Sequence, residues 1–529
     1  MKTTQLLFAI LLLPLLMFGQ LKPSPGYELK TGKPYPVVDA NTKSYFYDGS
    51  MVNMVKINKN NIVLQKYNAE TNQEISRKLL PPLKKGEKLL SIQKIKNTIY
   101  IFTLVDIKAT DRFSLYARPV NFENNSIDDR KKIIDLKSDY RNQLDFYISF
   151  DDSKILITNL KYQKYKDDKK NYDVIDMIVF NNELEIEWNK EVQMPYTEAQ
   201  MNNIEYAIDS KGIAYIITEV YNSSVPKKFV NNKKNYHLEL MTIIEGEIST
   251  SKIDDKGTNV NSIRFHEVAN NKMFLVGYYN DNMKTNNRNS DGVFVAKLDD
   301  NRDVETVSNY KFPLEIINQF ESKNVQEKNK RKAKKGKLDF PQLVLRNIIL
   351  GDDGSVLLVG EQYYSVTTTT TSTNGMTTSH TTYYYLDVLL TKINADGELA
   401  WMRKLPKSQR GERYLGGMSY KYVYHHGFHY ILYLDNLKNI DLPLDKAPVT
   451  HIDGRGGIFT AYKVSDADGT ATKASLLNIK EVKIAGNKKP LPIYQFSVNR
   501  ILQTPTGFVF EAYKKQKQDV MINVKFEEN

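Results

Sequence analysis

The chain has 529 residues, no cysteine and a formal net charge of +12. The absence of cysteine excludes disulfides, thiolate metal sites, cysteine nucleophiles and a lipid-modified cysteine anchor, and the length suffices for several small domains or one large closed β architecture. A positive balance favours anionic partners, but lysine is spread evenly and clusters strongly at a single place, so the charge alone indicates a solvated surface.

The first 19 residues have the layout of an export signal peptide. Lys2 supplies a positive end, an apolar run follows over 6–18, and Gly19 is a small residue that suits a cleavage site. The alternatives are an uncleaved anchor or a buried first strand, but Pro14 interrupts the run, which is short for a membrane span. We expect a mature chain without a transmembrane segment that acts outside the cytoplasm: periplasmic, at the cell surface or secreted.

A weak repeat of about fifty to seventy residues follows the leader. Its clearest copies lie at 146–157, 206–217 and 348–360, where an apolar strand reaches a turn rich in Asp, Ser and Gly and a second apolar strand returns. Apolar alternation and turn residues predict eight such units. They are 44–80, 88–122, 144–188, 204–253, a unit from 259 through 298, 343–405, 420–478 and 496–526.

Within a unit the pattern predicts four antiparallel strands and no crossover helix, which is the blade of a β-propeller. The sequence therefore predicts an all-β propeller over 44–529, with eight blades and with seven as the alternative. The last unit shows only three strands before the chain ends, and the segment 20–43 has no unit of its own. We expect that segment to supply the missing outer strand and close the ring, because exposed sheet edges invite aggregation.

Two insertions, 313–338 and 366–385, depart from the repeat. Residues 313–327 predict a short helix, and the basic run 328–337 follows it as either a docking site for an anionic partner or a solvated loop. Its candidate binding residues are Lys330, Arg331 and Lys332. The second insertion is rich in Thr and Tyr around Asn374-Gly375, which predicts a long hairpin with a tight turn; a disordered low-complexity tract is the alternative.

Residues 352–359 and 388–401 together resemble the repeat units of exported bacterial β-propeller proteins, with an Asp-Gly turn, an apolar strand, a second Asp-Gly turn and a closing Trp. The resemblance is good in the sixth unit, fair in the third and seventh, and loose elsewhere. It implies the propeller architecture for most of the mature chain. It implies no activity, because binding proteins, scaffolds and enzymes share such propellers.

No motif in the chain identifies a catalytic centre. There is no nucleophile elbow and no glycine-rich phosphate loop, and the paired carboxylates all fall at predicted turns. His425 and His429 flank a turn and form either a partial metal site or an ordinary hairpin. The Asp-x-Asp-Gly turns fit backbone turn chemistry better than calcium ligation. Catalytic residues are therefore unassigned, and neither a metal nor a cofactor is predicted.

Aromatic residues beside the long hairpin are the main binding candidates, since tyrosines at a rim can stack on sugars or anchor a protein; half-buried strand formers are the alternative reading. We expect an exported, non-enzymatic binding or scaffold protein whose partner is a protein or glycan, possibly an anionic one. A hydrolase or lyase acting on polysaccharide or peptide in the central funnel is the alternative, and a structural envelope component is a third. The export signal argues against nucleic acid. The candidate tyrosines are Tyr363, Tyr364, Tyr383, Tyr384 and Tyr385.

Overall fold

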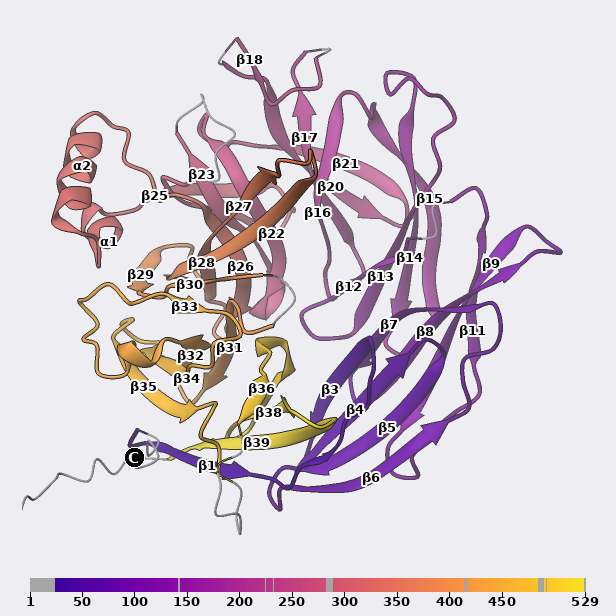
Figure 1. The fold of residues 1–529 in the computed structure, drawn as a ribbon. Coiled ribbons are helices and arrows are strands. Elements are labelled where there is room, and N and C mark those ends of the chain that lie inside the picture. The colour runs from indigo at the N-terminus through magenta and orange to yellow at the C-terminus, as the bar shows by residue number, and fades with distance from the viewer. Residues whose placement is uncertain are drawn as a thin grey trace, which may run out of the picture.

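Antiparallel sheets arranged in a ring dominate the fold (Figure 1). The computed structural model describes residues 24–527 apart from 141–142, 224, 232, 282–288, 413–415, 484–489 and 491. These residues form eight sheets of four or more strands and one two-stranded sheet. We number the larger sheets 1 to 8 in chain order. The predicted all-β propeller of four-stranded antiparallel sheets is confirmed, whereas the predicted signal peptide over 1–19 lies outside the described residues.

The strands of sheets 1, 3 and 4 lie side by side in chain order, whereas in sheet 2 both β10 and β11 pair with β9. Sheet 1 contains β3 (Thr42–Asp48), β4 (Met51–Asn58), β5 (Asn61–Asn68) and β6 (Gln73–Leu80). Sheet 2 contains β7 (Glu87–Ile95), β8 (Thr98–Ile107), β9 (Arg112–Asn121), β10 (Ser126–Ile127) and β11 (Lys131–Lys137). Sheet 3 contains β12 (Asp145–Ile148), β13 (Lys154–Leu160), β14 (Tyr172–Asn181) and β15 (Ile186–Thr197). Sheet 4 contains β16 (Met201–Ile208), β17 (Ala214–Tyr221), β20 (Tyr236–Ile244) and β21 (Glu247–Ile253), and the small hairpin of β18 (Phe229–Val230) and β19 (Lys233–Lys234) lies between β17 and β20 in the chain.

Sheets 5 to 8 carry the insertions and the closure of the ring. Sheet 5 contains β22 (Asn259–Val268), β23 (Lys272–Asn280), β24 (Gly292–Leu298) and β25 (Val304–Lys311). Sheet 6 contains β26 (Leu343–Leu350), β27 (Val356–Thr371), β28 (Thr377–Ile393), β29 (Leu399–Leu405), β30 (Gln409–Gly411) and β33 (His451–Ile452). Sheet 7 contains β31 (Tyr420–His425), β32 (Phe428–Asp435), β34 (Ile458–Ser465) and β35 (Ala471–Asn478). Sheet 8 contains β36 (Ile493–Gln495), β37 (Ile501–Thr504), β38 (Gly507–Lys514) and β39 (Gln518–Phe526), together with β1 (Tyr27–Thr31) and β2 (Tyr35–Pro36).

The second strand of each sheet is the most apolar because neighbouring sheets cover both of its faces. In β17 seven of the eight residues are buried. The turn before it shows why Asp and Gly recur there. Asp209 accepts hydrogen bonds from the backbone N–H of Lys211 and Ile213 and from the Tyr215 hydroxyl, while Gly212 takes a φ of +81°. Both carboxylate oxygens of Asp209 are thus used inside the turn, as expected for turn chemistry.

The two ends of the described chain meet in sheet 8. Strand β1 pairs antiparallel with β39, with Tyr27 opposite Phe526 and Thr31 opposite Ile522. Strand β2 continues along the same edge, with Tyr35 opposite Asp519. The N-terminal segment therefore provides the outer edge of a sheet whose other strands come from the C-terminal end of the chain.

The insertion after β25 contains two helices, α1 (Leu314–Asn318) and α2 (Lys323–Lys334), on the outside of the ring (Figure 1). This corrects the expectation of one helix over 313–327 followed by a basic loop. The helix is interrupted at Phe320, which has a φ of +69°, and a second helix begins where the Ser322 side chain accepts a hydrogen bond from Val325 N–H. Buried Lys404 anchors the insertion by donating to the carbonyl oxygens of Ile317 and Gln319.

Strands β27 and β28 form a long hairpin that projects beyond the rest of sheet 6 (Figure 1). Its exposed part is held by side-chain pairs across the strands, such as Thr367 with Thr381 at 2.9 Å. The loop is longer than the two-residue turn expected at Asn374-Gly375. Ser372 N–H donates to the Met376 carbonyl and Gly375, at a φ of +80°, donates to the Ser372 carbonyl. This is the three-residue loop with a left-handed glycine, the other common hairpin closure.

Candidate binding site beside the long hairpin

Five tyrosines gather where the hairpin leaves the sheet. Tyr364 lies opposite Tyr384, and their rings stack with centroids 4.7 Å apart. Tyr363 lies opposite Tyr385 on the other face of the hairpin, with ring centroids 4.9 Å apart, and also stacks on Tyr383 at 6.3 Å. The alternation of side chains along paired strands produces the two clusters. All five rings are half-buried, so they stiffen the hairpin base and also remain accessible.

Arg346, which the sequence did not single out, lies against the second tyrosine cluster. Its guanidinium carbon is 4.7 Å from the Tyr363 ring centroid and 5.9 Å from that of Tyr385. Its Nε donates to Glu361 Oε2 at 3.0 Å, while 30% of its side chain is exposed. The rings and the carboxylate together fix the direction of the guanidinium.

Glu361 is the buried centre of this arrangement. Its side chain is fully buried, as is that of Lys407, whose Nζ lies 2.8 Å from Glu361 Oε1. The Ser419 hydroxyl donates to the other carboxylate oxygen at 2.8 Å. Burial lowers the pKa of Lys407, and the Glu361 carboxylate opposes that shift. The Glu361 carboxylate thus lies between the Lys407 ammonium and the Arg346 guanidinium, and of these two cations only Arg346 is partly exposed.

A cavity of about 390 Å³ lies in front of Arg346. It lies where residues of the first strands of sheets 6 and 7 meet the segment that precedes β37. Its walls include Asn347, Tyr385, Ser419 and Asn499, and none of the described residues that line it is a carboxylate or a histidine. The cavity therefore presents one cation, hydroxyls and amides to a ligand.

The basic residues of the insertion lie elsewhere, on the exposed helix α2. Lys330 pairs with Glu327 at 2.7 Å and Lys332 with Asp339 at 2.9 Å, whereas Arg331 is exposed. No hydrogen bond or ion pair among the described residues joins Lys330, Arg331 or Lys332 to the five tyrosines. The structure thus brings the predicted tyrosines together and leaves the predicted basic residues apart from them.

The two histidines considered as a metal pair have separate surroundings. His425 stacks on His426 at 4.0 Å between ring centroids. His429 has Tyr422 Oη at 2.8 Å from Nδ1 and Asp466 Oδ1 at 2.8 Å from Nε2, so both of its ring nitrogens are engaged. Within the described part of the chain, no group of three or more His, Asp or Glu side chains is placed to hold a metal ion.

The first strands of sheets 4 and 5 carry a second set of titratable residues. Glu205 of β16 accepts a hydrogen bond from Arg264 of β22 at 3.2 Å, and burial raises the pKa of Glu205 to about 7. His266 lies two residues after Arg264, and burial lowers its pKa to about 4. This set combines a carboxyl whose pKa is raised, a guanidinium and an imidazole whose pKa is lowered.

No protein-family model matches the chain, and no curated protein matches it. Among solved structures, it is similar to a prolyl endopeptidase, with 10% identity and a TM-score of 0.39, over 89% of this chain and 54% of that one. The β-propeller domain of the Trilobed protease from Pyrococcus furiosus aligns at 11% identity and a TM-score of 0.33, over 82% of this chain and 96% of the other. The polysaccharide lyase Uly1 aligns at 9% identity and a TM-score of 0.34, over 85% and 92%. This chain spans only about half of the endopeptidase, and the activities named belong to those proteins.

No helix in the described residues has the length and apolar character needed to cross a bilayer.

Proposed function

We propose that this protein is an exported, non-enzymatic β-propeller that binds a carboxylate-bearing partner, a protein or a glycan, in the cavity beside the long hairpin. The observation that carries the proposal is the placement of Arg346. Its Nε is occupied by Glu361, and its two terminal nitrogens make no hydrogen bond to any described residue. They are therefore available to a carboxylate in the bidentate geometry that arginine favours.

The surroundings of Arg346 support binding of an anion in particular. Lys407 and Arg346 share the single carboxylate of Glu361, so that carboxylate does not compensate both cations, and Arg346 is the one that reaches the cavity. The neighbouring Tyr385 and Asn347 supply an aromatic surface and an amide for the remainder of the ligand. Because buried groups already fix the Arg346 side chain, it loses little conformational entropy when a ligand binds, which favours affinity.

The same cavity is poorly suited to hydrolysis. General acid–base catalysis needs a carboxyl, an imidazole or a comparable group within hydrogen-bond reach of the substrate. The described residues lining the cavity include neither a carboxylate nor a histidine. The Ser419 hydroxyl donates to Glu361, and none of the described residues that line the cavity is a histidine, so the Ser–His arrangement of a serine nucleophile is absent from this lining.

Binding can be tested with the chain from residue 20 onward, on an array of acidic and neutral oligosaccharides and in pull-downs from extracellular material. Replacement of Arg346 by Gln should weaken a carboxylate-bearing ligand at least about tenfold, because a charge-assisted bidentate contact is lost. Arg331→Gln removes the same charge from α2 and should leave binding unchanged. Equal binding by wild type and Arg346→Gln would show that the partner uses another surface.

A second candidate, a hydrolase or lyase acting on polysaccharide or peptide, is favoured by one observation. Glu205, with its raised pKa, lies beside Arg264 on strands that face the interior of the ring. If this pair is catalytic, a panel of polysaccharides and peptides should contain a substrate whose cleavage is lost in Glu205→Gln and retained in Arg346→Gln. An activity that survives in Glu205→Gln would remove this candidate.

A further inference from the structure

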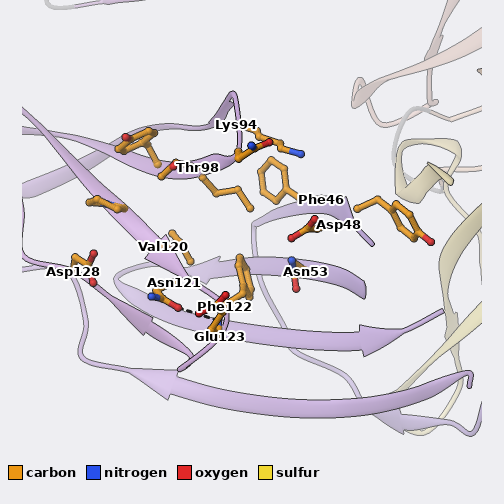
Figure 2. A pocket seen from close by; sticks show the side chains of 15 residues that line it. Phe46, Asp48, Asn53, Lys94, Thr98, Val120, Asn121, Phe122, Glu123 and Asp128 are labelled. Carbon is orange, nitrogen blue, oxygen red and sulfur yellow. Dashed lines mark hydrogen bonds between the residues drawn. The ribbon is translucent and has the colours of Figure 1, made fainter. Parts of the chain in front are cut away.

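A hollow of about 530 Å³ opens between sheets 1 and 2 (Figure 2). It lies where β3 ends and β8 begins, whereas the cavity beside Arg346 lies where the first strands of its sheets begin. The two are therefore at opposite ends of the first strands. Six of the residues that line the hollow matter for its chemistry: Phe46, Asp48, Asn53, Lys94, Glu123 and Asp128.

Asn53 is the unusual residue in this hollow. It lies on β4 directly opposite Phe46, at the start of a row in which Val55 and Ile57 follow on the same face and pack against sheet 2. The second strand of every other sheet has a large apolar or aromatic residue near this end of its row, packed toward the next sheet. These residues are Tyr100, Leu156, Tyr215, Phe274, Leu357, Tyr430 and Val509.

The amide of Asn53 has no partner in the described structure. Only 6% of the residue is exposed, and its Oδ1 is buried without a hydrogen bond. A buried amide that makes no hydrogen bond destabilises a protein, and an apolar residue would suit the row better. Figure 2 shows the Asn53 side chain directed toward the carboxylate of Asp48, with the ring of Phe46 beside them. The unsatisfied amide therefore belongs to the hollow.

The charges around the hollow restrict the kind of ligand. Asp48, Glu123 and Asp128 contribute three carboxylates against the single ammonium group of Lys94, so the lining is net negative and disfavours anions. A cation would supply hydrogen-bond donors to a carboxylate, but it would leave the NH₂ of Asn53 without an acceptor. A hydroxyl both donates and accepts, so it can satisfy either atom of the amide.

We propose that this hollow is a second binding site, which takes a neutral saccharide. Adjacent hydroxyls of one sugar ring bond to the Asn53 amide and the Asp48 carboxylate, and the apolar face of the ring lies on Phe46. An amide, a carboxylate and an aromatic face are complementary to a ring that carries vicinal hydroxyls on its edge and C–H groups on its face. The site does not include Arg346, so a negative result for this site would not contradict the function proposed above, and the reverse also holds.

The test uses the whole mature chain with glucose, galactose, mannose, xylose, N-acetylglucosamine and their short oligomers, observed by saturation-transfer NMR and then by titration. At least one of these sugars should bind the wild type. Replacement of Asn53 by Leu or of Phe46 by Ala should weaken that sugar at least about tenfold. Asp152→Asn, at an exposed turn between β12 and β13 that does not line the hollow, is the control and should bind the sugar like the wild type.

Thermal unfolding separates a ligand site from a structural role of Asn53. Asn53→Leu should raise the unfolding midpoint by about 1–3 °C, because an unpaired amide is replaced by an apolar residue in an apolar row. A lowered midpoint, together with unchanged sugar binding, would overturn the proposal. So would the absence of binding by every neutral sugar in the panel, or selective binding of lysine-rich peptides that is lost in Asp48→Asn.

Discussion

Two buried glutamates, each on the second strand of its sheet counted from the centre of the ring and each paired with a buried lysine, have different roles in the molecule. Glu511 of β38 and Glu361 of β27 are both fully buried beside a fully buried lysine, Lys56 and Lys407 respectively. They differ in the other groups that bind the carboxylate. We call the group around Glu511 the closed cluster, and we call the group around Glu361, which includes the partly exposed Arg346, the open cluster.

Around Glu511 the shortest contacts lie inside the junction between sheets 8 and 1, and Lys43 is a more distant cation at 3.8 Å. Lys56 Nζ and the Tyr35 hydroxyl donate to Oε1 at 2.5 and 2.8 Å, and the Tyr45 hydroxyl donates to Oε2 at 2.7 Å. These partners come from sheet 1 and from the N-terminal strand β2, so the cluster ties the two ends of the ring together. Around Glu361, by contrast, the Arg346 guanidinium extends to a cavity. A buried carboxylate can therefore hold two sheets together, or it can fix the direction of a cation that reaches the surface. The second case requires that one of the cations paired with the carboxylate is partly exposed.

The largest expected effect comes from removing the lysine of the closed cluster. Lys56→Met removes the cation that contacts Glu511 directly and leaves only Lys43, whose Nζ is 3.8 Å from Oε2. It should lower the free energy of unfolding by about 3–5 kcal/mol, as measured by urea denaturation. Lys407→Met is the matched variant in the open cluster. Because Arg346 still neutralises Glu361 there, its effect should be clearly smaller. Equal losses in the two variants would contradict the distinction between the clusters, and the double variant Lys56→Met, Glu511→Met should recover most of the loss.

An intermediate effect depends on pH and concerns Asp519, the second carboxyl of the closed cluster. Burial and the nearby Glu511 raise the pKa of Asp519 to about 6, against the opposing pull of Lys43, Lys56 and Arg500. A carboxyl with a raised pKa is protonated more readily in the folded state, so its contribution to stability is lost as pH rises from about 4 to above 6. Asp519→Asn should therefore raise the unfolding midpoint relative to wild type at pH 8, and the difference should vanish below about pH 4.

Exposed Asp152, replaced by Asn, is the control for the same change of side chain at a position outside the cluster. A difference between Asp519→Asn and wild type that stays constant from pH 4 to pH 8 would mean that the effect comes from packing and not from ionisation.

The smallest effect is expected at the exposed end of the hairpin. Its threonine pairs bury little surface, so deletion of 368–380 with a two-residue Asn-Gly turn in their place should change the free energy of unfolding by less than about 0.5 kcal/mol. Ligand binding beside Arg346 should persist, as judged by the same titration used for Arg346→Gln. Loss of binding in the deletion variant would place the partner on the hairpin end instead of in the cavity.

The sequence predicted the strands and their grouping into sheets well. The alternation of apolar and polar residues and the Asp-Gly turns depend on interactions within a few residues. The Asp209 turn shows the reason: its hydrogen bonds reach no further than Tyr215. The grouping of the candidate tyrosines followed in the same way, since Tyr363 and Tyr385 belong to one hairpin. The break at Phe320 was not predicted, because the pattern of apolar residues continued through it.

The centre of the candidate site was not predicted, because it depends on contacts between distant segments. Arg346, Glu361 and Lys407 come from strands and loops of sheet 6, and Ser419 comes from the approach to sheet 7, so the pairing within sheet 6 and its junction with sheet 7 bring them together. A weak signal existed: Arg346 and Asn347 interrupt the otherwise apolar strand 343–350, and Glu361 follows a buried apolar run. Asn53 carried no such signal, because one amide near a turn is ordinary until its burial and missing partner are known.

The pairing of β1 with β39 has a consequence for how the molecule is made. Tyr27 leaves the ribosome early, but its partner Phe526 follows about 500 residues later, a delay of roughly 25–100 s at ordinary rates of synthesis. Throughout that interval the first strand has no place to bind and the ring stays open. Final assembly is thus a late, long-range event, and a chaperone that shields the segment 27–36 would act on the step that seals the molecule.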